Sequence, residues 1–279
     1  MARLCLWSRA RSWEDAPAML RDVLSHLRLI RRLAATELRA RYWGSALGLV
    51  WAVVQPLTMI VLYTLIFAVV LKVKVGVRGS VTDFGLFLIC GMLPFNAVAD
   101  AIRRSSTVYV DQAHLLRRIA VPPIVLPASR VLLALAEQAL ALVLLLLLLT
   151  ILGRPPRIAA CGVLLLAPLQ LALTFGLAVA VASLAALVRD VATLAEPLLT
   201  IWFLGTPVFY PRDVLPDWLR PLIDANPLTP LVEGYRTLIL GGGFPPLADW
   251  LYLGAIAAFA LAAGHWVYRR TRPIIVDYV

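Results

Sequence analysis

The sequence predicts an all-α membrane protein with six transmembrane helices, an N-terminal amphipathic interface helix and short re-entrant helices between spans five and six. Three observations predict this fold class. The chain is 61% hydrophobic and only 15% charged, and its mean hydropathy of +0.86 excludes an ordinary soluble domain. Its apolar runs reach the roughly 20 residues needed to cross a bilayer. Its arginines gather at the ends of those runs, as orientation signals do.

The six predicted spans follow one another with mostly short connections. The first begins where a charged stretch ending in Tyr42 and Trp43 leads into an apolar run that stays uncharged until Lys72. The second is uncharged only to Ala99, and we expect its helix to continue out of the membrane through Arg104. The spans are predicted at about 46–71, 84–108, 124–152, 158–188, 191–210 and 247–268.

Two other segments are predicted to lie at the membrane surface. Residues 20–41 repeat with helical periodicity, and their arginines lie largely off the apolar face, which is typical of an interface helix. That face consists of Leu20, Val23, Leu24, Leu27, Ile30, Ala34 and Leu38. Residues 206–246 are too apolar for a solvated loop and too proline-rich for a span. We expect short helices there, at about 216–224 and 229–240, because proline stops helices.

The distribution of basic residues predicts the orientation. Lys and Arg are more frequent before the first span, after the second span and in the C-terminal tail than in the opposite loops. Both termini are therefore predicted to be cytoplasmic. Residues 1–19 and 269–279 are expected to be tails, and residues 20–268 a single transmembrane domain. The net charge of +10 is interpreted as this orientation signal, and no nucleic acid is expected as a partner.

The sequence has no motif that predicts catalysis or a metal site. Its lysines are Lys72 and Lys74, and neither follows a glycine as the Walker A motif requires. No nucleophile elbow or HExxH motif occurs, and the Cys and His residues match no metal-ligand spacing. We therefore expect a transport subunit that is not an enzyme, with no cofactor of its own. If transport is driven by ATP, the ATPase must be a separate chain.

Four segments together resemble a known family. They are residues 37–57, residues 114–132, the pair Arg189-Asp190, and residues 206–242 with the stretches PVFYP and NPLTPLVEGYR. They are similar to permease subunits of type-2 ABC exporters, in the branch that exports O-antigen, teichoic acid and capsular polysaccharides. The resemblance implies a homodimeric channel in the bacterial cytoplasmic (inner) membrane. It also implies two copies of a separate ABC ATPase, which binds ATP and Mg, and a lipid-linked glycan as substrate.

In that family, the segment between spans two and three is the coupling helix that docks in a groove of the ATPase. The corresponding residues 111–123 end in a double proline, which fixes the exit of the helix. The alternative is a solvated loop with ordinary cytoplasmic charge. The candidate coupling residues are Asp111, Gln112, His114, Leu115, Leu116, Arg117 and Arg118.

Charged residues near the membrane suggest further roles. Arg39 and Arg41 are candidates for binding the substrate pyrophosphate, because guanidinium groups pair with phosphate oxygens in a bidentate way. They could equally anchor the chain to anionic lipid head groups. Glu137, next to Gln138, is the acid deep in an apolar span, and Arg130 lies seven residues earlier on the same face. A structural ion pair is the favoured interpretation of this acid, against a functional one.

Aromatic residues and the outer segment supply the last candidates. Flat rings pack against the apolar faces of sugars, so aromatic side chains at the outer ends of spans one and five are candidate channel residues. An aromatic belt facing lipid is the alternative. The channel candidates are Tyr63, Phe67, Phe209 and Tyr210. The outer helices are expected to gate the channel, with Glu233 and Arg236 as an ion pair on the polar face of the second helix. Trp218 and Tyr235 are expected to anchor these helices at the membrane interface. The gate candidates are Trp218, Glu233, Tyr235 and Arg236.

Two functions compete with polysaccharide export. One is a type-2 ABC permease that exports a drug or a small lipid, from which the proline-rich outer segment distinguishes this chain. The other is a membrane glycosyltransferase or a secondary carrier that works without an ATPase. Such a protein needs catalytic carboxylates or paired broken helices in the membrane, and the acid deep in an apolar span is Glu137.

Overall fold

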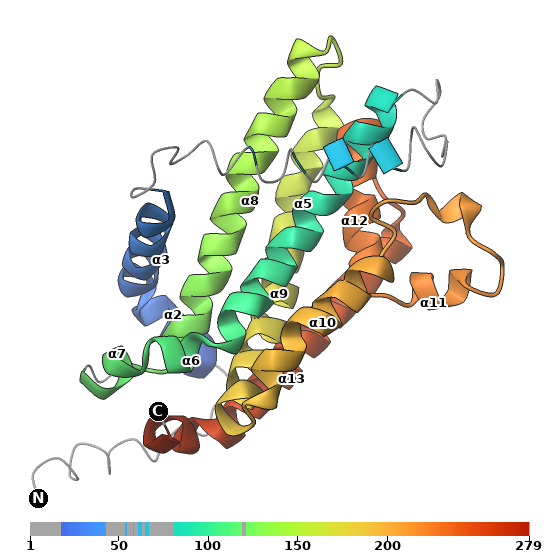
Figure 1. The fold of residues 1–279 in the computed structure, drawn as a ribbon. Helices are drawn as coiled ribbons and strands as arrows, with labels where there is room; N and C mark the ends of the chain where they lie inside the picture. The colour runs from blue at the N-terminus through green and yellow to red at the C-terminus, as the bar shows by residue number, and fades with distance from the viewer. Residues whose placement is uncertain are drawn as a thin grey trace, which may run out of the picture.

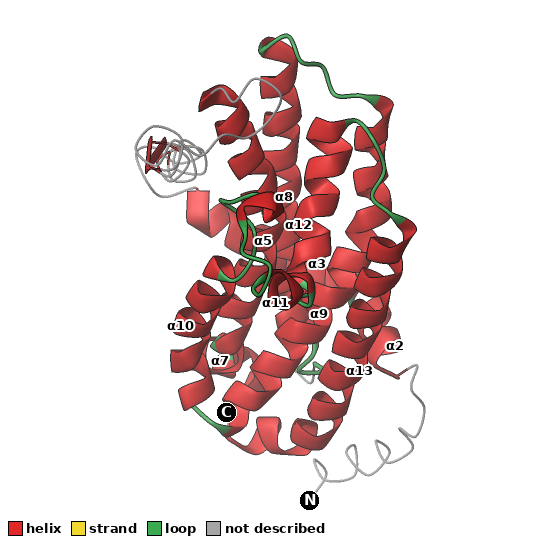
Figure 2. Cartoon of the chain, turned by 90° about the vertical axis from the view of Figure 1, so that its right-hand side faces the viewer, coloured by secondary structure: helices red, strands yellow, loops and turns green. Residues whose placement is uncertain are grey.

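The computed structural model describes residues 18–42, 81–118 and 121–278, together with a few single positions between 54 and 66. Every regular element in these ranges is helical, and the described residues contain no strand (Figure 2). The all-α prediction is therefore confirmed for this part of the chain. The predicted first span, 46–71, lies almost wholly outside the described residues, as do Tyr63 and Phe67.

Among the described residues, four helical segments are long and apolar enough to cross a membrane. They correspond to the second, third, fourth and sixth predicted spans. The helix of the second span continues through Arg104, as expected, and that of the sixth continues through the predicted C-terminal tail. The helices are α5 (Val81–Ser106), α8 (Val125–Ile151), η3 with α9 (Ile158–Gly162 and Val163–Leu187), and α13 (Leu247–Tyr278).

The helix at the predicted fifth span is shorter than expected. α10 (Asp190–Leu204) has 15 residues and is followed by Gly205 at its C-cap, whereas the prediction extended the span to residue 210. Pro207 and Pro211 follow directly, and proline disfavours helical geometry in the residue before it. A helix of this length rises about 22 Å, less than the roughly 30 Å of a bilayer core. The described helices therefore do not establish six spans.

The long helices run alongside one another and alternate in direction (Figure 1). The helices after α5, namely α6 (Val108–Asp111) and α7 (Ala113–Arg118), lie at the lower end of Figure 1, together with the C-terminal end of α13. The turn between α8 and η3 lies at the opposite end. This alternation is the arrangement expected of a multi-pass membrane protein.

Packing is closest between α9 and α13. A side chain at Gly176 would collide with the backbone of Ala260, and one at Gly264 with the backbone of Gly176. Glycine at both positions lets the helix backbones approach, which is a common way for helices to pack in membranes. The main core joins α5, α8, α9 and α13 to the outer segment. Its fully buried side chains include Phe84, Leu88, Leu166, Leu173, Leu231 and Leu253.

The end of α8 follows directly from its sequence. An unbroken leucine run carries the helix to Ile151, and Gly153 then adopts a left-handed conformation with φ of 71°. The Gly153 N–H donates to the Thr150 carbonyl (3.1 Å) and the Arg154 N–H to the Leu149 carbonyl (2.9 Å). These two bonds form a Schellman motif, which satisfies the last carbonyls of the helix. Two prolines then prevent the helix from continuing.

The predicted interface helix at residues 20–41 is two helices, α2 (Ala18–Ser25) and α3 (Leu27–Tyr42). The prediction of one continuous helix is wrong at His26. The Ser25 hydroxyl donates to the Asp22 carbonyl (3.1 Å), and the His26 Nδ1 lies 2.9 Å from the same oxygen. Such side-chain bonds compete with the helical backbone and interrupt it.

The outer segment contains three short pieces: η4 (Arg212–Val214), α11 (Arg220–Asp224) and α12 (Leu228–Arg236). A π-helical turn, Thr237–Gly241, continues α12. Helices were expected at about 216–224 and 229–240, so their existence is confirmed and the first is shorter than predicted. That these helices re-enter the membrane remains a prediction.

Candidate functional site

The helix pair α6–α7 has a buried side and an exposed side. Val108 and Tyr109 are buried in a cluster with Ile124, Tyr268 and other apolar side chains. Burial raises the pKa of the Tyr109 hydroxyl well above its ordinary value. The Thr107 hydroxyl donates to the Asp111 carboxylate (2.7 Å), which fixes the turn that starts α6. The pair is thus held rigidly against the bundle.

The exposed side of this pair differs from the expected coupling surface. Leu115 and Leu116 are half-buried and pack against the same apolar cluster, so they support the helix pair from beneath. Asp111 and His114 are exposed, as expected, and Val110 is an exposed apolar side chain that the sequence did not single out. Gln112 is half-buried, and the side chains of Arg117 and Arg118 lie outside the described residues.

A cluster of ion pairs connects α3 to α8. The Glu137 carboxylate accepts bonds from Arg41 Nη1 (3.1 Å) and Arg104 Nη2 (2.8 Å). The buried Arg130 guanidinium pairs with Glu37 instead. Glu137 therefore takes part in structural ion pairs between helices, which is the interpretation favoured from the sequence. Arg130, seven residues earlier on α8, pairs with a residue of α3 as well. Sequence spacing along one helix could not reveal these partners on another.

A second group of ion pairs links α5 to α10. Arg103 pairs with Asp100, as its spacing predicts, and also with Glu196 of α10, where Nη2 lies 3.1 Å from Oε1. Arg104 lies four residues from Asp100, a spacing at which the two could also pair, but it bonds to Glu137. Together, the two groups of ion pairs connect α3, α5, α8 and α10 by charged contacts.

The outer segment is anchored by Arg236, which is only 4% exposed. Its guanidinium donates to the carbonyl oxygens of Phe87 (3.2 Å), Pro207 (2.6 Å) and Val208, and to the Glu233 carboxylate (2.7 Å). The guanidinium carbon also lies 3.5 Å from the centroid of the Phe87 ring. The predicted pair of Glu233 and Arg236 is confirmed, but Arg236 lies in the core and not on a polar outer face.

Tyr235 is also buried, at 2% exposed, so it is not the interface anchor that the sequence suggested. Its hydroxyl donates to Gln170 Oε1 (2.7 Å) and accepts from Gln138 Nε2 (2.9 Å). Gln138 and Gln170 bond to each other, which joins α8, α9 and α12 through a buried polar network. Trp218, by contrast, is 78% exposed.

The aromatic candidates of the described part lie between α10 and η4. Phe209 is buried and packs against Phe203 and Tyr210, with ring centroids 5.6 and 5.1 Å apart. The Tyr210 hydroxyl donates to the Leu204 carbonyl (3.0 Å). These aromatic rings lie at the C-terminal end of α10 and pack against one another and against that helix. In the described ranges, no group of His, Cys, Asp or Glu side chains could hold a metal ion.

Comparison with known proteins identifies the family. Residues 28–240 match the ABC-2 type transporter family. An O-antigen export system permease protein, RfbA, of Myxococcus xanthus is 28% identical over 94% of this chain and 99% of its own length. Permeases of the same name from Klebsiella pneumoniae are 26% and 25% identical over 74% of this chain and 78% of their own. The family match covers most of the chain, and the protein therefore belongs to the membrane family of ABC-2 type transporters.

Proposed function

We propose that this chain is the channel-forming permease subunit of an ATP-driven exporter that moves a lipid-linked, O-antigen-like polysaccharide across the bacterial inner membrane. The observation that carries the proposal is the similarity to an O-antigen export permease along nearly the full length of both chains. Residues 206–240 of the proline-rich outer segment, which the sequence associates with the polysaccharide branch, lie within the matched region.

The proposal includes a specific assembly. Two copies of the chain, each with six spans and cytoplasmic termini, form the channel, and two copies of a separate ABC ATPase bind ATP and Mg. α10 contributes the fifth span together with the residues that follow it, since the helix alone is short. The helices α11 and α12 re-enter the membrane and form the outer gate, which Arg236 holds to α5 through the Phe87 carbonyl.

Two cytoplasmic sites have roles in this assembly. The exposed side of α6–α7, with Asp111 and His114, docks on the ATPase. Arg39 and Arg41, at the end of α3, hold the pyrophosphate of the substrate as it enters. The Glu137 carboxylate orients Arg41, whose side chain is 44% exposed and can therefore reach a ligand.

Deletion of the gene tests the proposal. The deletion strain should lose surface polysaccharide and accumulate lipid-linked glycan inside the cell, and expression of the wild-type chain should restore export. Unchanged surface polysaccharide, with altered export of a drug or a small lipid, would support the other branch of the family instead.

A further inference from the structure

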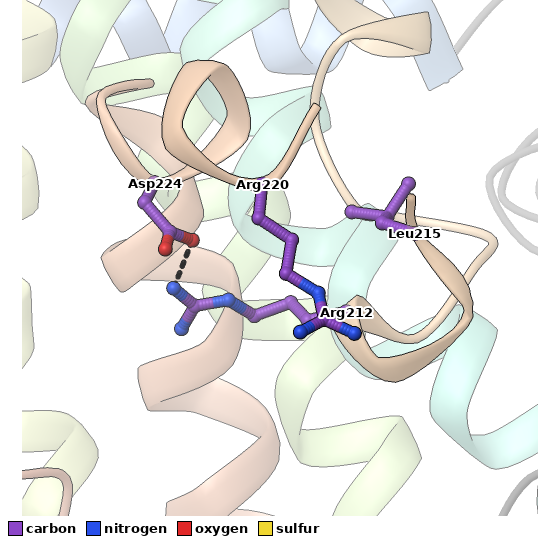
Figure 3. A pocket seen from close by; sticks show the side chains of 4 residues that line it. All are labelled: Arg212, Leu215, Arg220 and Asp224. Carbon is purple, nitrogen blue, oxygen red and sulfur yellow. Dashed lines mark hydrogen bonds and ion pairs between the residues drawn. The ribbon is translucent and has the colours of Figure 1, made fainter. Parts of the chain in front are cut away.

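A pocket of about 310 Å³ opens in the outer segment between η4 and α11 (Figure 3). Arg212, Leu215, Arg220 and Asp224 line it. Figure 3 shows the Arg212 side chain directed toward Asp224 and the Arg220 side chain extending down from α11 into the same space. Two guanidinium groups and one carboxylate give this lining an excess of one positive charge. The function proposed above makes no use of the pocket.

The existing ion pairs leave both arginines able to bind another anion. Arg212 pairs with Asp224, and these side chains are 38% and 50% exposed. The Arg220 Nη1 lies 3.1 Å from the carboxylate of Asp217, a side chain that is 94% exposed. Ion pairs in contact with water contribute little to stability. Each guanidinium also has five N–H donors, and these contacts use only some of them.

Large apolar side chains are exposed in the same segment as this basic pocket. Val214, Trp218 and Leu222 are all exposed, and each lies within two residues of a lining residue along the chain. Exposed tryptophan is typical of a membrane–water interface. A basic pocket in a segment with exposed apolar side chains matches a ligand that joins a phosphate to hydrocarbon chains.

We propose that this pocket binds the phosphate group of a membrane lipid at the surface of the bilayer. A phosphate group suits the pocket, because its tetrahedral set of oxygens offers more acceptor sites than the two oxygens of a carboxylate and can bond to both guanidinium groups. The pocket lies within the size range of small-molecule sites, so a head group can enter it. The Asp224 carboxylate holds Arg212 in place. It also repels anions, so it disfavours ligands with more negative charge than one phosphate group. The proposal does not depend on the exported substrate.

Lipid retention measures this binding directly. The full chain is placed in nanodiscs of phosphatidylcholine with a small fraction of phosphatidic acid, and native mass spectrometry counts the phosphatidic acid that remains bound. The variant Arg212→Gln/Arg220→Gln should retain it about tenfold less well, because it loses charge-assisted bonds to the phosphate. The matched control, Arg154→Gln/Arg157→Gln, removes the same charge from the exposed turn after α8 and should retain it as the wild type does.

A second variant changes retention in the opposite direction. Asp224→Asn removes the carboxylate that competes with phosphate for Arg212, so retention should rise. Equal retention by the wild type and the Arg212→Gln/Arg220→Gln variant would overturn the proposal. Displacement of the lipid by an equal concentration of sn-glycerol 3-phosphate would also overturn it, since the pocket would then bind phosphate without the hydrocarbon chains.

Discussion

At the scale of single residues, Arg236 is a charged group that the fold depends on. It is the last residue of α12 and is buried, and its guanidinium donates to three backbone carbonyls as well as to Glu233. Burial lowers the pKa of this guanidinium, and the neighbouring Glu233 carboxylate opposes that shift. The carbonyls of Pro207 and Val208 belong to an irregular stretch of backbone. Among the described helices, no N–H group is therefore in place to bond to them if the Arg236 guanidinium is removed.

Arg236→Met should therefore lower the free energy of unfolding by about 3 kcal/mol or more, because it leaves buried acceptors and the Glu233 carboxylate unpaired. The apparent melting temperature of the purified chain in detergent measures this loss. Arg220→Met is the matched control: it removes an exposed arginine from the same segment and should change the temperature little. Equal melting temperatures for both variants would show that Arg236 does not anchor the segment.

The sequence predicted one of these contacts and not the others. Glu233 and Arg236 are three residues apart in a helix, so their pairing follows from local geometry. The Phe87 carbonyl is 149 residues away along the chain. No residue type marks such an acceptor, because every residue has a carbonyl. The burial of Tyr235 was missed for the same reason, since its partners Gln138 and Gln170 lie on distant helices.

At the scale of elements, α3 is fixed to α8 by two ion pairs. In one pair the acid lies on α3, and in the other the acid lies on α8. Glu37 and Arg41 are four residues apart on α3, and their partners on α8 are Arg130 and Glu137. Positions four apart share one face of a helix, so both pairs form in a single packing arrangement. The pairs thus determine how α3 is aligned against α8.

Arg130→Glu should misalign the two helices, because it places a buried acid beside Glu37. We expect a loss of about 2 kcal/mol or more in the free energy of unfolding. The charge-exchanged variant Glu37→Arg/Arg130→Glu should recover most of that loss, and a double-mutant cycle on the apparent melting temperature measures the recovery. No recovery in the exchanged variant would mean that the two side chains do not act as a pair.

The exposed side of α6–α7 predicts which substitutions affect ATPase docking. Val110→Asp/His114→Glu alters only exposed side chains, so it should release the ATPase during co-purification while the permease keeps its melting temperature. Leu115→Asp should lower the melting temperature as well, since Leu115 packs against the bundle. Full co-purification of the ATPase with the Val110→Asp/His114→Glu variant would place the docking surface elsewhere.

Element boundaries were predictable where local chemistry determines them. The glycine and two prolines after α8 end that helix as the sequence predicts. The interruption at His26 was missed, because the apolar periodicity of residues 20–41 continues through a break made by side-chain bonds to the backbone. The early end of α10 was missed because residues 205–210 are apolar enough to continue a span.

At the scale of the whole molecule, the alternation of the long helices predicts which residues face each side of the membrane. In a variant without native cysteines, a cysteine at position 218 should react with a membrane-impermeant thiol reagent added outside the cell, since Trp218 is exposed. A cysteine at position 114 should react only after the membrane is opened. A cysteine at position 235 should stay unlabelled, because Tyr235 is buried. Labelling of position 114 from outside would contradict the proposed orientation.

We propose that this chain forms the path for a lipid-linked polysaccharide and depends on a separate ATPase. Transport in proteoliposomes tests it most directly, with the purified chain and its co-purifying ATPase reconstituted together and with each protein reconstituted alone. We predict that lipid-linked glycan crosses the bilayer only when both proteins and ATP are present, and that the chain alone hydrolyses no ATP. Glycan movement by the chain alone, or ATP hydrolysis that persists after every partner is removed, would contradict the claim.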